Sequence, residues 1–239
     1  MPENSTTFPV GSADSAQPSA RTIGAVWLLY FVISSLGAVF TKGLIVPTDA
    51  ALTATSILAH AGRYRAGFAF DLIGNAIYLA LTALLYGLFR PVNRNLALIA
   101  AFFSLTGCIV QIFGELLRLV PVVLLTESHV AGAFTVAQMQ AASVLSLAVY
   151  NHVYDISFIL FALFELVLGY LIVKSRYVPR VLGWIWMASG GGWLTFLWPP
   201  LARTIWPVLF GLGGLAELGL VAWLLVKGVN TQAREAPAQ

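Results

Sequence analysis

Charged residues are scarce in this sequence. Only 10% of its 239 residues are Asp, Glu, Lys or Arg, whereas soluble globular domains contain about 25%. Hydrophobic residues make up 59% of the chain, and the mean hydropathy is +0.86. A chain of this composition has too few polar side chains to cover a water-soluble surface, so the lipid bilayer is the expected partner of most of it.

Residues that bind metals and haem are also few. The single cysteine, Cys108, excludes an intramolecular disulfide and a cysteine-based zinc cluster. Of the three histidines, only His152 falls in an apolar segment, which argues against a haem held by two axial histidines between helices. The 13 Lys and Arg residues are scattered singly along the chain, so nucleic acid is not an expected partner.

Long apolar segments, by contrast, recur along the whole chain. Six of them have the length of a membrane-crossing helix and lack the alternation of barrel strands: residues 22–41, 66–89, 95–120, 146–173, 180–199 and 204–227. The predicted fold class is therefore all-α, a polytopic transmembrane helix bundle of six spans over residues 21–229. The polar composition of residues 1–20 predicts a disordered cytoplasmic tail, and residues 230–239 are predicted to form a short cytoplasmic tail.

Two connections between the predicted spans are long enough to contain structure of their own. In the first, Thr48 as an N-cap and Asp49 in the first turn predict a short helix over residues 49–61. The second connection, residues 121–145, is predicted to be a loop whose last turn is helical and continues into the fourth span.

The distribution of Lys and Arg predicts the orientation. One side of the six-span arrangement collects eight of them: Arg21, Arg90, Arg94, Lys174, Arg176, Arg180, Lys227 and Arg234. The other side has five: Lys42, Arg63, Arg65, Arg118 and Arg203. Because cytoplasmic loops carry the excess of basic residues, both termini are predicted to be cytoplasmic.

Several short strings resemble a known family. They are LIVPTDA at 44–50, LFRPVNR at 88–94, LGYL at 168–171 and YVPRVLG at 177–183, together with His152-Val153-Tyr154 and Glu217-Leu218-Gly219. In this order and spacing they are similar to the bacterial membrane family known as domain of unknown function 4386. A small residue, often glycine, stands in that family where this chain has Val153. The resemblance implies a six-span protein of the bacterial inner (plasma) membrane and assigns no reaction or substrate.

Polar residues inside the apolar segments are the candidates for function, because a charged side chain at bilayer depth costs at least about 2.5 kcal/mol without a partner or a water-filled cavity. The candidates are Asp71, Asn75, Gln111, Glu115, Asn151, His152, Asp155 and Glu217. Most form pairs at i,i+4 spacing, which places each pair on one helix face. The midpoints of the segments place those of the second, third and fourth spans toward the outside, Glu217 near the middle and Glu165 toward the inside. This pattern predicts a polar pocket in the outer half of the bilayer that binds or transports a small polar solute, a cation or a proton.

Two alternatives remain open. In the first, His152, Asp155, Asp71 and Glu115 supply one nitrogen and three carboxylates to a divalent metal, in a hydrolase-like intramembrane enzyme; no other cofactor is predicted. In the second, the polar residues only hold helices together, for example as an ion pair between Glu115 and Arg118, and the protein is an accessory or structural membrane subunit.

Overall fold

The computed structural model describes residues 19–127 and 132–229, so the predicted tails at 1–20 and 230–239 lie almost wholly outside the described residues. Within these ranges the chain is helical and contains no strand. Its elements are α1 (Ala20–Thr41), α2 (Ala50–Ala59), α3 (Ala61–Phe89), α4 (Arg94–Thr126), α6 (Val136–Ser175), α7 (Arg180–Trp193), the 3-10 turn η1 (Leu194–Leu197), α8 (Pro199–Thr204) and α9 (Trp206–Val226). The predicted all-helical class is confirmed.

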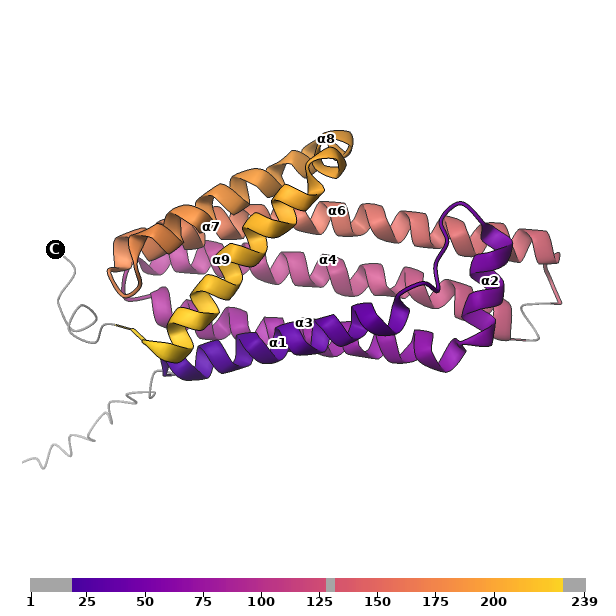
Figure 1. Cartoon of the computed structure of the whole chain (residues 1–239), viewed down its shortest axis with the longest axis horizontal. Coiled ribbons are helices and arrows are strands. Elements are labelled where there is room, and N and C mark those ends of the chain that lie inside the picture. The colour runs from indigo at the N-terminus through magenta and orange to yellow at the C-terminus, as the bar shows by residue number, and fades with distance from the viewer. Residues whose placement is uncertain (1–18, 128–131, 230–239) are drawn as a thin grey trace, which may run out of the picture.

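Among the described residues, five helices are long and apolar enough to cross a membrane, namely α1, α3, α4, α6 and α9. The remaining predicted span, 180–199, consists of the 14-residue helix α7 followed by η1. Figure 1 shows that α7 runs alongside α6 and that α9 returns to the end from which α1 starts. The chain is therefore a multi-pass helical bundle.

The long helices form a closed ring. Contacts join α1 to α3, α3 to α4, α4 to α6, α6 to α7, α7 to α9 and α9 back to α1. Glycines allow the closest of these approaches: a Cβ on Gly169 would lie 2.7 Å from the carbonyl oxygen of Gly183, and one on Gly190 would lie 2.7 Å from that of Ala162. Small residues have the same role at many membrane helix interfaces.

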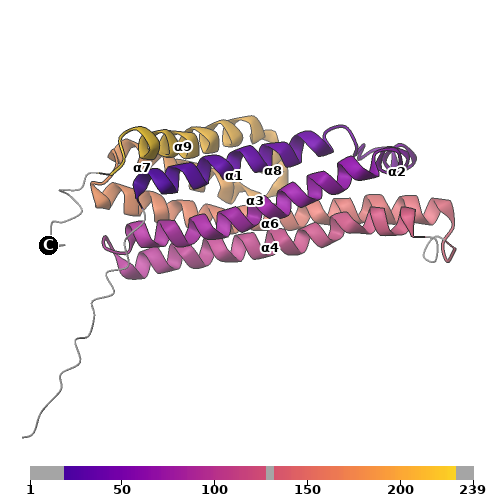
Figure 2. The same cartoon turned by 90° about the horizontal axis from the view of Figure 1, so that it is seen from below.

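The two ends of the bundle differ. One end, called here the basic end, contains the start of α1, the end of α9 and the residues Arg21, Arg94, Lys174, Arg180 and Lys227. From this end α1 and α9 extend ~33 and ~32 Å, at 1.5 Å per residue. Helices α3, α4 and α6 are longer, at ~44, ~50 and ~60 Å. They continue past α1 and α9 into the projecting end, where α2 lies (Figures 1 and 2).

The projecting end corrects two local predictions. The short helix α2 begins one residue later than predicted, because the side chain of Asp49, and not that of Thr48, accepts the hydrogen bond from the Leu52 backbone N–H, at 2.8 Å. The predicted loop at 121–145 is largely helical, since α4 continues to Thr126 and α6 begins at Val136. A small apolar cluster explains this extension, because Ile57, Tyr64, Val122 and Leu147 bury their side chains against one another there.

Candidate functional site

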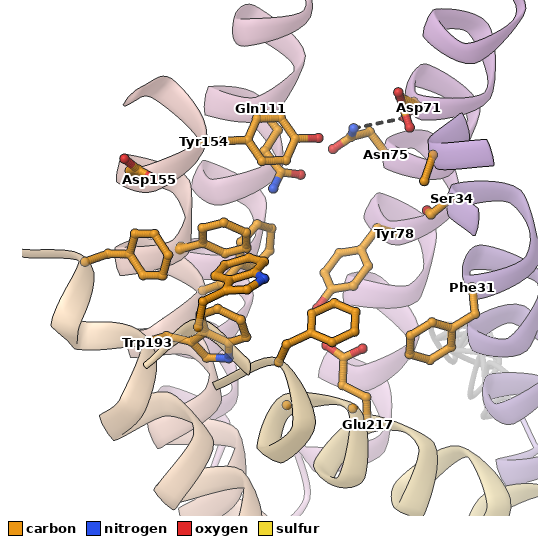
Figure 3. Close-up of a pocket in the computed structure, with 18 of the residues that line it drawn as sticks. Phe31, Ser34, Asp71, Asn75, Tyr78, Gln111, Tyr154, Asp155, Trp193 and Glu217 are labelled. Atoms are coloured by element: carbon orange, nitrogen blue, oxygen red, sulfur yellow. Dashed lines mark hydrogen bonds between the residues drawn. The ribbon is translucent and has the colours of Figure 1, made fainter. Parts of the chain in front are cut away.

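A cavity of about 830 Å³ lies inside the helix ring, with walls from α1, α3, α4, α6, α7, η1, α8 and α9. Aromatic side chains from at least five of these elements form much of its surface, among them Tyr30, Tyr78, Phe158, Phe196 and Phe210. Figure 3 shows polar side chains gathered at one end of the cavity and Glu217 below Tyr78 at the other. This central cavity is therefore aromatic along its walls and polar at both ends.

Six of the eight candidate residues line the central cavity, namely Asp71, Asn75, Gln111, Asn151, Asp155 and Glu217. The two amides whose hydrogen bonds are defined make structural contacts. Asn75 donates to the backbone carbonyl of Asp71 at 3.0 Å, within α3, and Gln111 donates to the Ser157 hydroxyl at 3.1 Å, between α4 and α6. The other two candidates, Glu115 and His152, lie outside the lining.

Glu115 belongs instead to a buried ion cluster centred on Arg118. The Arg118 guanidinium donates to Glu115 at 2.9 Å and also to Asp71, so that one arginine joins α3 to α4. The Tyr150 hydroxyl donates to the second oxygen of Glu115 at 3.2 Å, and the Tyr64 hydroxyl donates to the carbonyl of Arg118 at 2.9 Å. With Glu115 0% and Arg118 3% exposed, this Arg118 cluster matches the structural interpretation of Glu115, while Asp71 faces both the cluster and the cavity.

His152 and Asp155 lie at the other side of the polar end. The imidazole Nδ1 is 3.7 Å from the Asp155 carboxylate, and 64% of the His152 side chain is exposed. Arg203 of α8 also approaches Asp155, at 3.4 Å. Asp155 is thus shared between two basic groups at the polar end of the cavity.

The metal set proposed from the sequence is not assembled. It required His152, Asp155, Asp71 and Glu115 to meet. Asp71 and Glu115 are instead held on the Arg118 guanidinium, and Asp155 lies beside His152 and Arg203. No group of three or more His, Cys, Asp or Glu side chains lies close enough to hold a metal ion within residues 19–127 and 132–229. This arrangement has a simple physical cause, because the Arg118 guanidinium lies between the carboxylates of Asp71 and Glu115.

The most unusual side chain of the cavity is Glu165. Its position in the sequence predicts a place toward the inner side of the bilayer, and it is not among the eight candidate residues. It is 5% exposed, it lines the cavity, and its Oε2 atom is buried without a hydrogen-bond partner. Glu217 of α9 lines the same end and is close enough to interact with Glu165 electrostatically. Neither carboxyl group forms an ion pair within the described part of the chain.

The depth of this pair follows from helix geometry. Counted from the basic end, Glu165 and Glu217 both lie ~15 Å into the bundle, at 1.5 Å per residue, which is half of a hydrocarbon core about 30 Å thick. The other titratable side chains that interact electrostatically with this pair are Tyr30 of α1 and Tyr78 of α3. The sequence prediction placed Glu165 toward the inside because it counted depth from the midpoint of the predicted span 146–173, whereas the ~15 Å is counted from the basic end of α6.

Comparison with known proteins supports the family suggested by the short strings. No curated protein and no solved structure matches the chain. The family model described as "Domain of unknown function (DUF4386)" matches residues 22–228, which is nearly the whole helical bundle. The chain therefore belongs to the DUF4386 family of integral membrane proteins.

Proposed function

We propose that this membrane protein binds a monovalent cation at Glu165 and Glu217 in the central cavity, and that the cation replaces a proton. The observation that carries the proposal is the Glu165 carboxyl group, which is almost fully buried, lines the cavity and has an oxygen without a hydrogen-bond partner. Native proteins rarely leave such a group unsatisfied, and those that remain often serve a ligand.

The exchange with a proton follows from the energetics of burial. A carboxyl group without a basic partner at this depth is far cheaper as the neutral acid than as the carboxylate. A cation bound between Glu165 and Glu217 supplies the missing counter-charge and favours the ionised form. Binding of the cation and loss of a proton are therefore coupled at the same atoms.

The proposed location is the bacterial inner membrane, with both termini in the cytoplasm. The positive-inside rule supports this orientation, because the basic residues of the short connections gather at the basic end, where the described chain also begins and ends (Figure 1). At the opposite end, Arg63 donates to the carbonyls of Phe40 and Lys42, both at 2.7 Å, and so closes the end of α1. In this orientation the polar end of the central cavity faces outward.

Proton release tests the proposal directly. Purified full-length protein in weakly buffered detergent is titrated with permanently charged or non-titrating cations: sodium, potassium, tetramethylammonium and methyltriphenylphosphonium. We expect at least one of these cations to release about one proton per chain, and Glu165→Gln or Glu217→Gln to weaken that response at least tenfold.

Asp49→Asn is the matched control. It converts an acid to its amide at the N-cap of α2, where asparagine caps as well as aspartate does, so the proton release is expected to remain as in the parent. If none of the four cations binds or releases protons, the proposal is wrong, and the polar residues have the structural role of an accessory subunit.

A further inference from the structure

We infer that the ligand of the central cavity is a lipophilic organic cation, meaning one whose charged centre carries aromatic or branched alkyl groups. This inference rests on the proposed cation binding at Glu165 and Glu217 and names the class of cation. Three features of the cavity support it, namely its aromatic walls, its size and the depth of its mouth.

Aromatic rings surround the path from the mouth to the two carboxyl groups. Phe158 stacks on Trp193 with ring centroids 5.0 Å apart and lies 5.0 Å from Phe196, and Trp206 packs edge-on against both Trp193 and Phe196. Faces of such rings attract cations, most strongly organic cations that shed water easily. A hydrated inorganic ion gains little from this surface, whereas aryl or alkyl groups bury their own apolar area against it.

A second aromatic group lies beside the carboxyl pair. Tyr30 and Tyr78 meet edge-on with centroids 4.8 Å apart, and Tyr78 also meets Phe161 at 5.4 Å. In Figure 3, Tyr78 stands above Glu217, Phe31 to its right and Trp193 to its left. The negative charge of the cavity is thus enclosed by rings, an arrangement that suits a charged centre surrounded by apolar substituents.

The size of the cavity excludes a bare ion as a well-fitting ligand. Its volume of about 830 Å³ lies within the ~300 to 1,000 Å³ range of pockets that hold drug-sized molecules. A small ion would leave most of this space empty or filled with water. A cation with several rings would contact the walls and reach Glu165 and Glu217 at the same time.

The mouth of the cavity lies at bilayer depth. At the basic end α1 and α9 pack tightly, since a Cβ on Gly24 would lie 2.9 Å from Leu225, and the two helices then separate toward the projecting end (Figure 1). Among the cavity-lining residues, Ser35 and Phe210 are exposed along this separation, at ~22 and ~25 Å from the basic end. Both depths fall within a hydrocarbon core about 30 Å thick, so the opening favours a ligand that partitions into lipid.

Three probes separate charge from apolar surface. Methyltriphenylphosphonium has both, triphenylphosphine oxide has nearly the same shape without the charge, and tetramethylammonium has the charge without the rings. Calorimetric titration of the full-length protein in nanodiscs is expected to give one methyltriphenylphosphonium per chain, bound at least tenfold more tightly than either of the other two. Glu217→Gln is expected to weaken this binding at least tenfold.

A pair of glycine variants tests the location without removing a charge. Gly214 lines the cavity and Gly211, one turn earlier on α9, does not, and a Cβ on either glycine meets no atom within 4 Å. Gly214→Phe is therefore expected to fill the cavity and weaken methyltriphenylphosphonium binding at least tenfold. Gly211→Phe is the matched control and is expected to change the affinity less than twofold, with both variants melting close to the parent.

The remaining outcomes overturn the inference in distinguishable ways. If tetramethylammonium binds as tightly as methyltriphenylphosphonium or more tightly, and Glu217→Gln removes this binding, the ligand is not a lipophilic cation but the proposed cation site is retained. Equal binding of triphenylphosphine oxide makes the cavity a site for neutral apolar molecules and contradicts both. Methyltriphenylphosphonium binding that survives in Gly214→Phe places the ligand elsewhere, and the absence of binding by every cation tested removes the proposed function together with this inference.

Discussion

The protein contains two buried acidic regions with opposite surroundings. In the Arg118 cluster, Asp71 and Glu115 share one guanidinium, and Tyr150 adds a hydrogen bond to the remaining Glu115 oxygen. Beside the central cavity, Glu165 and Glu217 face each other without a basic partner among the described residues, and one Glu165 oxygen has no hydrogen bond. Buried acidic side chains are therefore paired with a base in one region of the bundle and lack a basic partner in the other.

The difference lies in where the counter-charge comes from. The Arg118 cluster is internally complete, so its acids hold α3, α4 and α6 together through contacts that need no ligand. The Glu165 and Glu217 pair is incomplete, so a proton or a bound cation must supply what the protein does not. Replacing an acid of the Arg118 cluster with an apolar residue should lower the unfolding free energy. Replacing an acid of the ligand site should raise the unfolding free energy of the unliganded protein.

The largest effect is expected from Arg118→Met. Removal of the guanidinium leaves Asp71 and Glu115 as buried carboxylates without a partner, and breaking a buried ion pair in this way costs about 3 to 5 kcal/mol. Denaturant unfolding of the detergent-solubilised protein, followed by circular dichroism, measures this loss.

The control for this variant removes the two acids as well. Asp71→Asn and Glu115→Gln, added to Arg118→Met, leave no unpaired charge and are expected to recover most of the lost stability. Unfolding of Arg118→Met at the same denaturant concentration as the parent would show that the Arg118 cluster does not stabilise the bundle.

A smaller loss is expected when the cluster is disturbed from outside. A Cβ on Gly37 of α1 would lie 2.3 Å from Asp71 Oδ1, so Gly37→Ala forces either Asp71 or α1 to move, at about 1 to 3 kcal/mol. Gly62→Ala is the control, because its Cβ meets nothing within 4 Å and alanine favours a helix by about 0.5 to 1 kcal/mol. Equal stability of the two variants in the same unfolding assay would contradict the close approach of α1 to Asp71.

Replacement of Glu165 is expected to raise the stability of the protein, whereas the substitutions in the Arg118 cluster lower it. Replacing Glu165 with Met removes a buried polar atom that has no partner, and leaving such a group unsatisfied costs about 1 to 3 kcal/mol. Glu165→Met should therefore stabilise the empty protein by on the order of 1 kcal/mol, seen as a higher melting temperature, while it abolishes cation binding. Glu115→Met is the matched variant in the Arg118 cluster and should destabilise; a loss of similar size in both would erase the distinction between the two regions.

The sequence predicted the architecture well because the bilayer imposes it. Apolar segments of helical length are local features, and each can be recognised in the sequence without knowledge of its neighbours. The length of α6 could not be predicted in this way, because it depends on apolar contacts of Leu147 with Tyr64 and Val122 of other helices. Depths counted from the midpoints of the predicted spans therefore did not reveal that Glu165 and Glu217 lie at the same distance from the basic end.

The candidate site was predicted only in part for a related reason. Spacing of i,i+4 placed Asp71, Gln111 and Asp155 on cavity-facing stripes, and all three line the cavity. Spacing within one helix does not show which acid on another helix pairs with an arginine. The ion pair of Arg118 with Glu115, one turn away in α4, could therefore be predicted, but its ion pair with Asp71 of α3 could not. Pairing across helices depends on helix rotation and depth together, and a single sequence specifies neither.

The smallest effect is expected at the third acidic position, Asp155 at the polar end of the cavity. Its pair with Arg203 spans 3.4 Å, and 61% of the Arg203 side chain is exposed, so water screens the attraction as it does in surface pairs, which contribute about 0 to 1 kcal/mol. Arg203→Gln should lower the unfolding free energy by less than about 1 kcal/mol, and added salt should remove the difference, because salt screens exposed charges first. His152→Gln, which alters the other basic neighbour of Asp155, should have an equally small effect. A loss from Arg203→Gln that matches Arg118→Met and persists in high salt would mean that Asp155 and Arg203 form a buried ion pair that closes the polar end of the cavity.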